Sequence, residues 1–360
     1  MQENADSKHA ASVLERLAEV LPARKRVLII PHDYPDPDAL AAAAAIHLLL
    51  AERHGIPSRI AFTGQVSRAE NKELLRRMRC RWSLIEDVRQ PIRGTVPAIV
   101  VDTTPWSRNV TIPSFARPVA VIDHHQHATS RPGHNLIVDI RSGAGATTTI
   151  AHEYLKAAEI PVPRWLASIM AYAIASETLD LSRDCERADL DAYNALIDRA
   201  DLKLIGRIRH APLPRAYFSH LQEAITNARR VGNVAWSHLR SVQQPEIIAE
   251  VADLLLRMEG MRWSFCTANL NGGLVISMRS SQRGARCSHI LRSVVRNAGS
   301  AGGHHRMAAG YVNMEKLSPA QRESRRRELV LELAGRIIRP RPKDAKALDG
   351  LTQKLVERTR

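Results

Sequence analysis

Short, almost wholly apolar runs recur between residues 26 and 140 and set the strictest limit on how this chain can fold. Unbroken apolar runs, as opposed to alternating ones, are typical of strands that are covered on both faces, as in a parallel sheet. Helical segments follow the first two runs, so the sequence predicts an α/β fold with a parallel sheet. The runs are RVLIIP (26–31), SRIAFTG (58–64), PAIVVDTT (97–104), PVAVIDHH (118–125) and HNLIVDI (134–140).

Helical patterns then complete this first domain. Helices are expected over 145–160, 162–175 and 186–204, so that the domain, which also includes an N-terminal helix, spans residues 1–204. A helical linker is expected over residues 205–230.

The remaining chain predicts a second, smaller α/β domain at residues 231–340. Strand-like runs lie on either side of an Asn-Gly-Gly hairpin signal at 271–273, and helices are expected over 246–259 and 287–297. Residues 341–360 are rich in basic side chains and are expected to form a solvated tail.

Composition bounds the partners and the compartment. Lys and Arg number 52 against 37 Asp and Glu, a formal net charge of +15, and such a surface attracts nucleotides, phosphates and nucleic acid. The four cysteines form no C-x-x-C pair, which argues against a zinc knuckle or a disulfide framework. No segment resembles a signal peptide, and the longest apolar stretch, ALAAAAAIHLLLA, is too short for a bilayer. A soluble cytoplasmic protein that does not bind membranes is expected.

Acidic and histidine side chains gather where the predicted strands end. Ligands of a parallel α/β sheet bind beyond the carboxyl ends of its strands, so these side chains are expected to share a site. Carboxylates with two or three imidazoles favour Mn²⁺ or Mg²⁺, and the acidic groups are too many for one ion, which predicts two metals with a bridging carboxylate. The candidates are His32, Asp36, Asp38, Asp102, Asp123, His124, His125 and, after a helix, Glu177 and Asp180.

Five motifs in order carry a resemblance to a known family. HDYPDPDAL, VVDTT, IDHH and ASETL resemble the four motifs of the DHH phosphoesterase superfamily, and AGGHHRMAAG resembles the glycine-rich motif of the DHH-associated C-terminal domain. The resemblance covers about residues 25–340. It implies a parallel-sheet catalytic domain, a smaller associated domain, and an active site in the cleft between them.

The resemblance also implies a role for each candidate. His32, Asp36 and Asp102 would hold one Mn²⁺, while Asp38, Asp102, His124 and the acid of the fourth motif would hold the other, with Asp102 bridging and Mg²⁺ as an alternative metal. Asp123 would orient an imidazole, and His125 would contact the scissile phosphate. Asp33 is not a ligand in the family pattern and is expected to be a solvated loop residue.

The associated domain would bind the part of the substrate that is not cleaved. Glycines allow backbone amides to approach an anion closely, and arginine guanidinium groups suit bidentate phosphate contacts. By similarity the substrate-binding residues are Arg279, Arg283, Gly302, Gly303, His304 and His305, with His304 standing where the family has a third glycine.

The fourth motif leaves one ligand open. In ASETLDL, Glu177 stands where the family usually has aspartate, and Asp180 is a rival three residues later. Glu177 is favoured because Ser176 and Thr178 preserve the frame of the motif. A Gly-rich turn, GAGATTT (143–149), could also offer backbone amides to a phosphate.

The predicted activity is metal-dependent hydrolysis of short oligonucleotides to mononucleotides, and of 3′-phosphoadenosine 5′-phosphate (pAp) to AMP, as in the bifunctional oligoribonuclease and pAp phosphatase branch. Two divalent ions make hydroxide available for in-line attack on phosphorus and offset the phosphate charge. Aromatic residues make up 4% of the chain, too few to suggest a long stacking platform. The alternatives are a linear or cyclic dinucleotide phosphodiesterase, a polyphosphate or pyrophosphate hydrolase, and a catalytically degraded nucleotide-binding module. The oligomeric state, including a homodimer, stays open.

Overall fold

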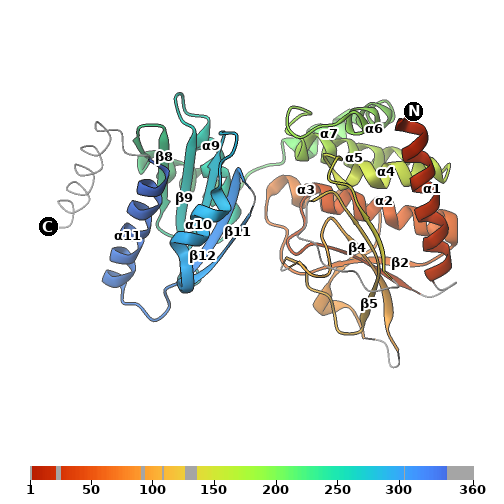
Figure 1. Ribbon diagram of the computed structural model, residues 1–360, viewed down its shortest axis with the longest axis horizontal. Coiled ribbons are helices and arrows are strands. Elements are labelled where there is room, and N and C mark those ends of the chain that lie inside the picture. The colour runs from red at the N-terminus through yellow and green to blue at the C-terminus, as the bar shows by residue number, and fades with distance from the viewer. Residues whose placement is uncertain are drawn as a thin grey trace. The chain divides into compact units, whose positions relative to one another are not determined.

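The computed structural model describes residues 2–21, 26–90, 94–107, 109–125, 136–303 and 305–338, without the side chains of 2–7 and 297. The chain divides into two units, Met1–Pro212 and Leu213–Arg360, and each is described by itself (Figure 1). The basic tail predicted for residues 341–360 lies outside the described residues.

The first unit contains a six-stranded parallel sheet, which confirms the predicted α/β class. Its strand order is β3-β2-β1-β4-β5-β6, so the chain reverses its direction of travel between β1 and β4. A ligand crevice is expected at such a switch point, beyond the carboxyl ends of the strands. The strands are β1 (Val27–Pro31), β2 (Ser58–Phe62), β3 (Trp82–Leu84), β4 (Val96–Val101), β5 (Ala116–Asp123) and β6 (Ile137–Ile140).

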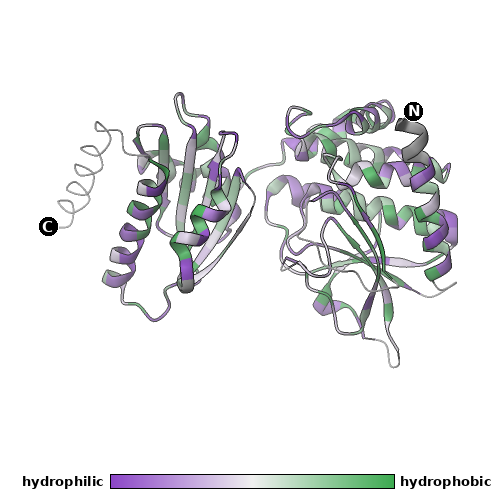
Figure 2. Cartoon of the chain, in the orientation of Figure 1, coloured by the Kyte–Doolittle hydropathy of each residue, from purple (hydrophilic) through white to green (hydrophobic). Residues whose placement is uncertain are grey.

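The two faces of this sheet are covered differently. Apolar side chains of α1, α2, α4 and α5 build the larger core on one face, whereas segments 85–88 and 110–116 cover the other. Figure 2 shows the hydrophobic character of the central strands that these two layers bury. The helices of this unit are α1 (Gln2–Val20), α2 (Pro37–His54), α3 (Ala69–Arg77), α4 (Thr147–Ala157), α5 (Arg164–Glu177), α6 (Arg187–Ile197) and α7 (Leu202–Arg209), with a 3₁₀ turn at Ile85–Asp87.

The helix predicted over 186–204 is wrong in its length, because it is broken into α6 and α7. Asp201 starts the second of these helices: its side chain accepts hydrogen bonds from the amides of Lys203 (3.0 Å) and Leu204 (3.2 Å) and so caps α7. Helices α4 and α5 confirm the other two predictions, with ends shifted by a few residues.

The second unit contains a six-stranded mixed sheet in the order β11-β12-β10-β9-β8-β7, in which β8 and β9 are parallel and the other pairs antiparallel. Asn271 and Gly272 have φ of 47° and 75°, as the two central residues of a tight hairpin require, which confirms the predicted turn between β9 and β10. The strands are β7 (Arg229–Val231), β8 (Val234–Leu239), β9 (Trp263–Leu270), β10 (Gly273–Ser280), β11 (Gly299–Gly303) and β12 (Met307–Asn313).

Helices pack on both faces of the second sheet and close two separate cores. Helix α11, which was not predicted from the sequence, begins with a capping box between Ser318 and Gln321. No helix in the described part of the chain is both long and apolar enough to cross a membrane. The helices of this unit are α8 (Arg215–Thr226), α9 (Glu246–Leu256), α10 (Cys287–Val295) and α11 (Pro319–Ile337), with a 3₁₀ turn at Arg296–Ala298.

Candidate active site

The loop from β1 to α2 brings the first group of candidates to the carboxyl edge of the parallel sheet. His32 follows β1 directly, and Asp36 caps α2 by accepting a hydrogen bond from the amide of Ala39 at 3.0 Å. Pro37 occupies the first helical position, where its missing N–H costs nothing. Asp38 lies in the first helical turn and is buried, so two carboxylates are fixed beside the N-terminus of one helix.

Asp102 stands between two histidines. It follows β4, in the left-handed region at φ 60°, and its amide donates to the carbonyl of Ile122 at 2.9 Å. Its Oδ2 lies 3.6 Å from Nε2 of His32, and its Oδ1 lies 3.6 Å from Nε2 of His124. One buried carboxylate therefore presents a different oxygen to each imidazole, at the switch point between β1 and β4.

Backbone carbonyls fix the orientation of both imidazoles. Nδ1 of His32 lies 2.8 Å from the carbonyl oxygen of Asp33, and Nδ1 of His124 lies 3.2 Å from that of Ala144. A carbonyl can only accept, so each Nδ1 carries a proton and donates it, while Nε2 of each ring faces the carboxylates and is the nitrogen that a cation could bind. Nε2 of His124 is buried and lacks a hydrogen-bond partner among the described residues. A cation at this point would satisfy it, so the donors fit a metal.

The segment 143–149 holds two of the carboxylates. The amides of Thr147 and Thr148 donate to the two oxygens of Asp38 at 2.7 and 2.8 Å, and the Thr147 hydroxyl donates to Oδ1 of Asp102 at 2.7 Å. The N-terminus of α4 thus binds an anion, but that anion is the carboxylate of Asp38. The idea that these two amides meet a substrate phosphate is therefore wrong, and the support they give to Asp38 was missed.

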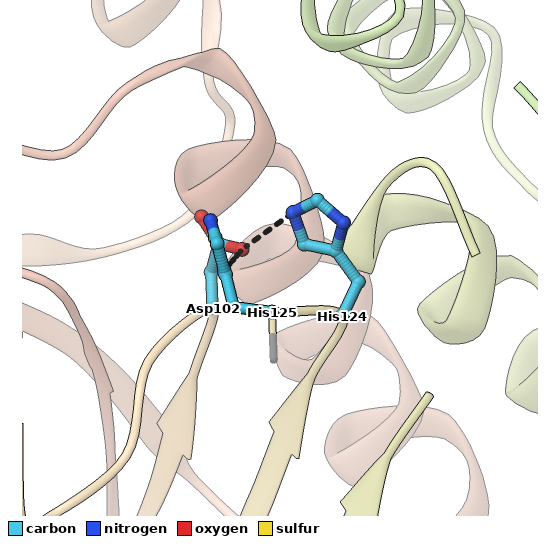
Figure 3. A group of neighbouring side chains, drawn as sticks. All are labelled: Asp102, His124 and His125. Atoms are coloured by element: carbon cyan, nitrogen blue, oxygen red, sulfur yellow. Dashed lines mark ion pairs between the residues drawn. The ribbon is translucent and has the colours of Figure 1, made fainter. Parts of the chain in front are cut away.

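Asp123 holds the imidazole of His125. Oδ1 of Asp123 accepts from the backbone amide of His125 at 3.1 Å and lies 2.8 Å from its Nδ1. Nδ1 of His125 is also 3.6 Å from Oδ1 of Asp102, and the rings of His124 and His125 have centroids 4.2 Å apart. Figure 3 shows both rings beside the Asp102 carboxylate at the ends of neighbouring strands.

The candidate ligands form two clusters that share Asp102. One contains His32, Asp36 and Asp102, and the other contains Asp102, His124 and His125. Asp38 borders the second cluster, with Oδ2 at 3.8 Å from Nε2 of His124. Two clusters with one common carboxylate match the donor pattern of a two-cation centre.

The pKa shifts at the site indicate buried negative charge that bound cations would balance. Burial, and then the charges of Asp38 and Asp36, raise the pKa of Asp102 well above its usual range. Burial raises the pKa of Glu177 to about 7, and the charges of Asp36 and Asp38 add to this. Burial alone would lower the pKa of His32, but the neighbouring Asp36 outweighs it and raises the value to about 9. The metal-free carboxylates thus repel one another, and bound cations would relieve that repulsion.

Glu177 and Asp180 are placed differently. Glu177 ends α5, is half-buried, and is close enough to Asp36 and Asp38 for their charges to shift its pKa. Asp180 is exposed and accepts a hydrogen bond from Arg209 at 2.9 Å. The turn between them is strained, because residues 179–181 have φ of 47°, 53° and 63° without any glycine. The position of Glu177 favours it as the ligand of the fourth motif.

The carboxylate of Asp33 makes hydrogen bonds that connect its loop to another segment. Its carboxylate accepts from the amide of Thr111 at 2.9 Å and from the Thr111 hydroxyl at 2.8 Å, and its own amide donates to the carbonyl of Asn109. Asp33 is thus a half-exposed loop residue, as expected, and its carboxylate is hydrogen-bonded as well. Asp33 joins the loop after β1 to the segment that precedes β5.

The proposed substrate-binding residues of the second unit lie at one end of its sheet. Arg279 pairs with Met307, and Gly303 with Ala308, on adjacent strands. A Cβ at Gly302 would have no atom within 4 Å, so there is space on that side of the strand, whereas one at Gly303 would lie 2.4 Å from the carbonyl oxygen of Met307. Of the other candidates, Arg283 and His305 are exposed and His304 lies outside the described residues.

Arg279 already has an anionic partner within the second unit. Its Nε donates to Asp253 at 2.7 Å, and its Nη1 donates to the hydroxyl of Ser277 and the carbonyl of Met278. The guanidinium is thus held in a fixed position with a carboxylate where a phosphate oxygen could bind.

We expect the affinity for Mn²⁺ to rise with pH up to about pH 9. His32, with a pKa of about 9, and Glu177, with a pKa of about 7, hold protons that a cation must displace. For each proton that the cation displaces, the Kd should fall about tenfold for every unit by which the pH rises, until the pH reaches the pKa of that group. Titration calorimetry at pH 7 in buffers of different ionisation enthalpy counts these protons. Heats that do not depend on the buffer would contradict the assignment, and Glu177→Gln should remove the contribution near pH 7.

Part of the chain matches a known protein family, and two relatives share sequence with it. Residues 26–174 match the family model described as DHH family, N-terminal domain. The uncharacterized protein MJ1633 of Methanocaldococcus jannaschii is 28% identical over 307 residues, and a probable manganese-dependent inorganic pyrophosphatase of Enterococcus faecalis is 28% identical over 182 residues. These matches cover 85% and 50% of this chain but 62% and 58% of the relatives' lengths.

One solved structure shares the fold over most of its length. The crystal structure of an exopolyphosphatase-related protein from Bacteroides fragilis aligns with a TM-score of 0.63 and 13% identity, and the alignment covers 91% of this chain and 95% of the other. At this identity the likeness concerns the fold alone, and it extends over both units.

Proposed function

Because residues 26–174 match the model of the DHH family N-terminal domain, we propose that the chain is a metal-dependent phosphoesterase that hydrolyses short oligonucleotides to mononucleotides and pAp to AMP. The observation that carries the proposal is the placement of Asp102, whose two oxygens face Nε2 of His32 and Nε2 of His124 at 3.6 Å each. The name of the manganese-dependent relative supports the choice of cofactor.

Two divalent cations, Mn²⁺ or Mg²⁺, fit the donors of the site. His32, Asp36 and Asp102 would hold the first, and Asp38, Asp102, His124 and Glu177 the second. When bound, such ions lower the pKa of water and offset the charge that develops on phosphate oxygens.

The protein's own contribution is to orient the substrate phosphate and stabilise its charge. Asp123 holds Nδ1 of His125 at 2.8 Å, which leaves the other ring nitrogen to contact a phosphate oxygen. Burial would lower the pKa of His125, but its hydrogen bond to Asp123 and the charge of that carboxylate outweigh burial and raise it. When the ring carries a proton on both nitrogens, Nε2 can donate a charge-assisted hydrogen bond to a phosphate oxygen.

The second unit would supply affinity for the part of the substrate that is not cleaved. Arg279 and Gly302, which has free space on its Cβ side, lie toward the same end of the sheet, with Gly303 and His305 nearby and Arg283 in the turn after β10. A net charge of +15 favours anionic substrates, and the low aromatic content favours short ones over long single strands.

Three other functions are alternatives. The pyrophosphatase relative favours a phosphoanhydride substrate, that is pyrophosphate or polyphosphate, and linear or cyclic dinucleotides are further candidates. A degraded module that binds nucleotides without hydrolysis is the alternative from another class.

A substrate panel separates phosphodiester hydrolysis from phosphoanhydride hydrolysis and from binding without turnover. Initial rates with Mn²⁺ are measured on pApA, pAp, cyclic di-AMP, pyrophosphate and polyphosphate. We expect the highest kcat/KM on pApA, with release of AMP. A preference for pyrophosphate would replace the oligonucleotide assignment, and binding of pApA without turnover on any substrate would support the degraded module.

We expect Arg279→Ala to act on binding. Loss of a charge-assisted phosphate contact, about 1.5–3 kcal/mol, should raise the KM for pApA about 10- to 100-fold, and His305→Ala should act in the same direction. Hydrolysis of bis(p-nitrophenyl) phosphate, which lacks a distal nucleotide, should change by less than about threefold on the same reasoning. Asp253→Ala is the matched control: it removes the carboxylate that competes for Arg279, so the KM for pApA should fall or stay constant. Equal losses on both substrates would contradict this role of the second unit.

A further inference from the structure

The segment 143–149 links three candidate ligands to one another. Its Ala144 carbonyl orients His124, the amides of Thr147 and Thr148 hold Asp38, and the Thr147 hydroxyl contacts Asp102. A displacement of this segment would therefore move groups of both clusters at once. Whatever fixes the segment also fixes the metal site.

Asp189, in the first turn of α6, grips the segment at two points. Its Oδ2 accepts from the amide of Gly145 at 2.8 Å and from the amide of Glu186 at 2.9 Å, and its Oδ1 accepts from the Thr149 hydroxyl at 2.6 Å. The side chain is fully buried, where an ionised carboxylate is costly unless hydrogen bonds satisfy it. Three donors do so here, and two of them belong to the segment.

Gly145 shows how close this contact is. A Cβ at this position would lie 2.6 Å from the carbonyl oxygen of Asp184, 2.8 Å from Oδ2 of Asp189 and 2.9 Å from the Thr178 side chain. Thr178 is the buried neighbour of Glu177. The contact between Gly145 and Asp189 is therefore also packed against the turn that carries Glu177, the proposed ligand of the fourth motif.

Apolar packing does not hold the start of the segment on all sides. Gly143 and Ala144 line a cavity of about 980 Å³, whose walls also include Glu186, Ala188 and Ala192. Ala144 also packs against the core, but the cavity supplies no van der Waals contacts on its side, so directional bonds add to the restraint on this stretch.

We infer that Asp189 is a positioning residue of the metal centre, which it serves by fixing segment 143–149 and, through that segment, Asp38, Asp102 and His124. The inference rests on the function proposed above, because that proposal makes these three residues the ligands. Asp189 itself touches neither metal nor substrate in this assignment. Its effect should therefore appear as looser metal binding.

The test compares Asp189→Ala, Asp189→Asn and Glu186→Ala in the full chain. The electron paramagnetic resonance signal of free Mn²⁺ gives the Kd, and thermal unfolding in EDTA gives the Tm of the metal-free protein. Asp189→Ala should weaken Mn²⁺ binding at least about tenfold, the lower end of the scale for groups that support metal ligands. Asp189→Asn should stay within about threefold, because its amide oxygen can accept from Gly145 and Glu186 while its NH₂ donates to the Thr149 oxygen.

Glu186→Ala is the matched control for helix stability. Glu186 and Asp189 form the reciprocal capping box of α6, so either alanine variant weakens the start of this helix. Only Asp189→Ala also removes the bonds to Gly145 and Thr149. Glu186→Ala should therefore lower the Tm in EDTA but leave the Kd for Mn²⁺ within about twofold, since the Asp189 carboxylate keeps its bonds to Gly145 and Thr149.

Two outcomes would overturn the inference. In the first, Asp189→Ala and Glu186→Ala bind Mn²⁺ with equal affinity. In the second, Asp189→Asn binds Mn²⁺ as weakly as Asp189→Ala does. If Asp189→Ala does not fold, Thr149→Val removes one of the three bonds and should still weaken Mn²⁺ binding by about threefold or more, as partial loss of a supporting contact predicts; an unchanged Kd would overturn the role. A wild-type protein that binds Mn²⁺ but hydrolyses none of the panel would contradict the proposed function alone.

Discussion

Asp102→Asn should abolish phosphoesterase activity while the fold remains intact. Each oxygen of Asp102 faces a different histidine at 3.6 Å, so one substitution removes the charge that both cations would share. Because loss of groups that merely support a ligand already costs about 10–100-fold, we expect kcat/KM to fall by more than about 100-fold.

Stability should not fall with the activity. Asparagine tolerates the left-handed backbone at φ 60° as well as aspartate does, and its oxygen can still accept from the Thr147 hydroxyl. Burial and neighbouring carboxylates raise the pKa of Asp102 well above its usual range, so its ionisation opposes folding of the metal-free protein at neutral pH. The neutral amide avoids this cost, and the Tm in EDTA should be equal or higher.

The measurements are kcat/KM on pApA with saturating Mn²⁺ and thermal unfolding in EDTA. A variant that kept a tenth of wild-type activity would contradict the two-cation assignment. A variant that lost both activity and fold would show that Asp102 is needed for structure before chemistry.

Glu177→Gln should cut turnover by about 10–100-fold and weaken the binding of the second Mn²⁺. Burial raises the pKa of this carboxyl to about 7, with Asp36 and Asp38 adding to the shift, which places its charge in the field of the site. Glutamine keeps the length of the side chain and its place at the end of α5 but offers no negative charge to a cation.

Asp180→Asn is the matched control. Asp180 lies three residues further on, is exposed, and is bound to Arg209 at 2.9 Å, so its neutral analogue should stay within a few-fold of wild type, as exposed ion pairs contribute little. Metal titration and initial rates on pApA compare the two variants. The reverse ranking would make Asp180 the ligand, and no effect from either would mean that the second cation is held without an acid from this motif.

The parallel sheet was predictable because burial on both faces leaves a clear mark on each strand. Runs such as PAIVVDTT, which contains β4, have almost no polar interruption, and the acidic and histidine residues that follow them needed only the topology rule to be placed at one edge. By contrast, β3 has three residues and no such run, so no pattern indicated it.

The contacts that support the candidate ligands were not predictable in the same way. Thr147 and Asp38 are 109 residues apart, and Asp189 and Gly145 are 44 residues apart. From the local sequence alone, each of these residues would be interpreted as the start of a helix or as part of a turn. Their roles arise only when the tertiary structure brings the N-termini of α2, α4 and α6 to neighbouring positions.

The strained turn after Glu177 affects the stage of folding at which the metal ligands come together. Three successive left-handed residues without glycine, 179–181, cost roughly 1–2 kcal/mol each, so an isolated peptide of this sequence would not hold the turn. Such a conformation persists only where the surrounding structure over-determines it. The fourth motif is therefore not a local unit that could be transplanted by itself. Its carboxylate gains its geometry from cooperative folding of the whole unit, so the full set of ligands assembles only when the unit is complete.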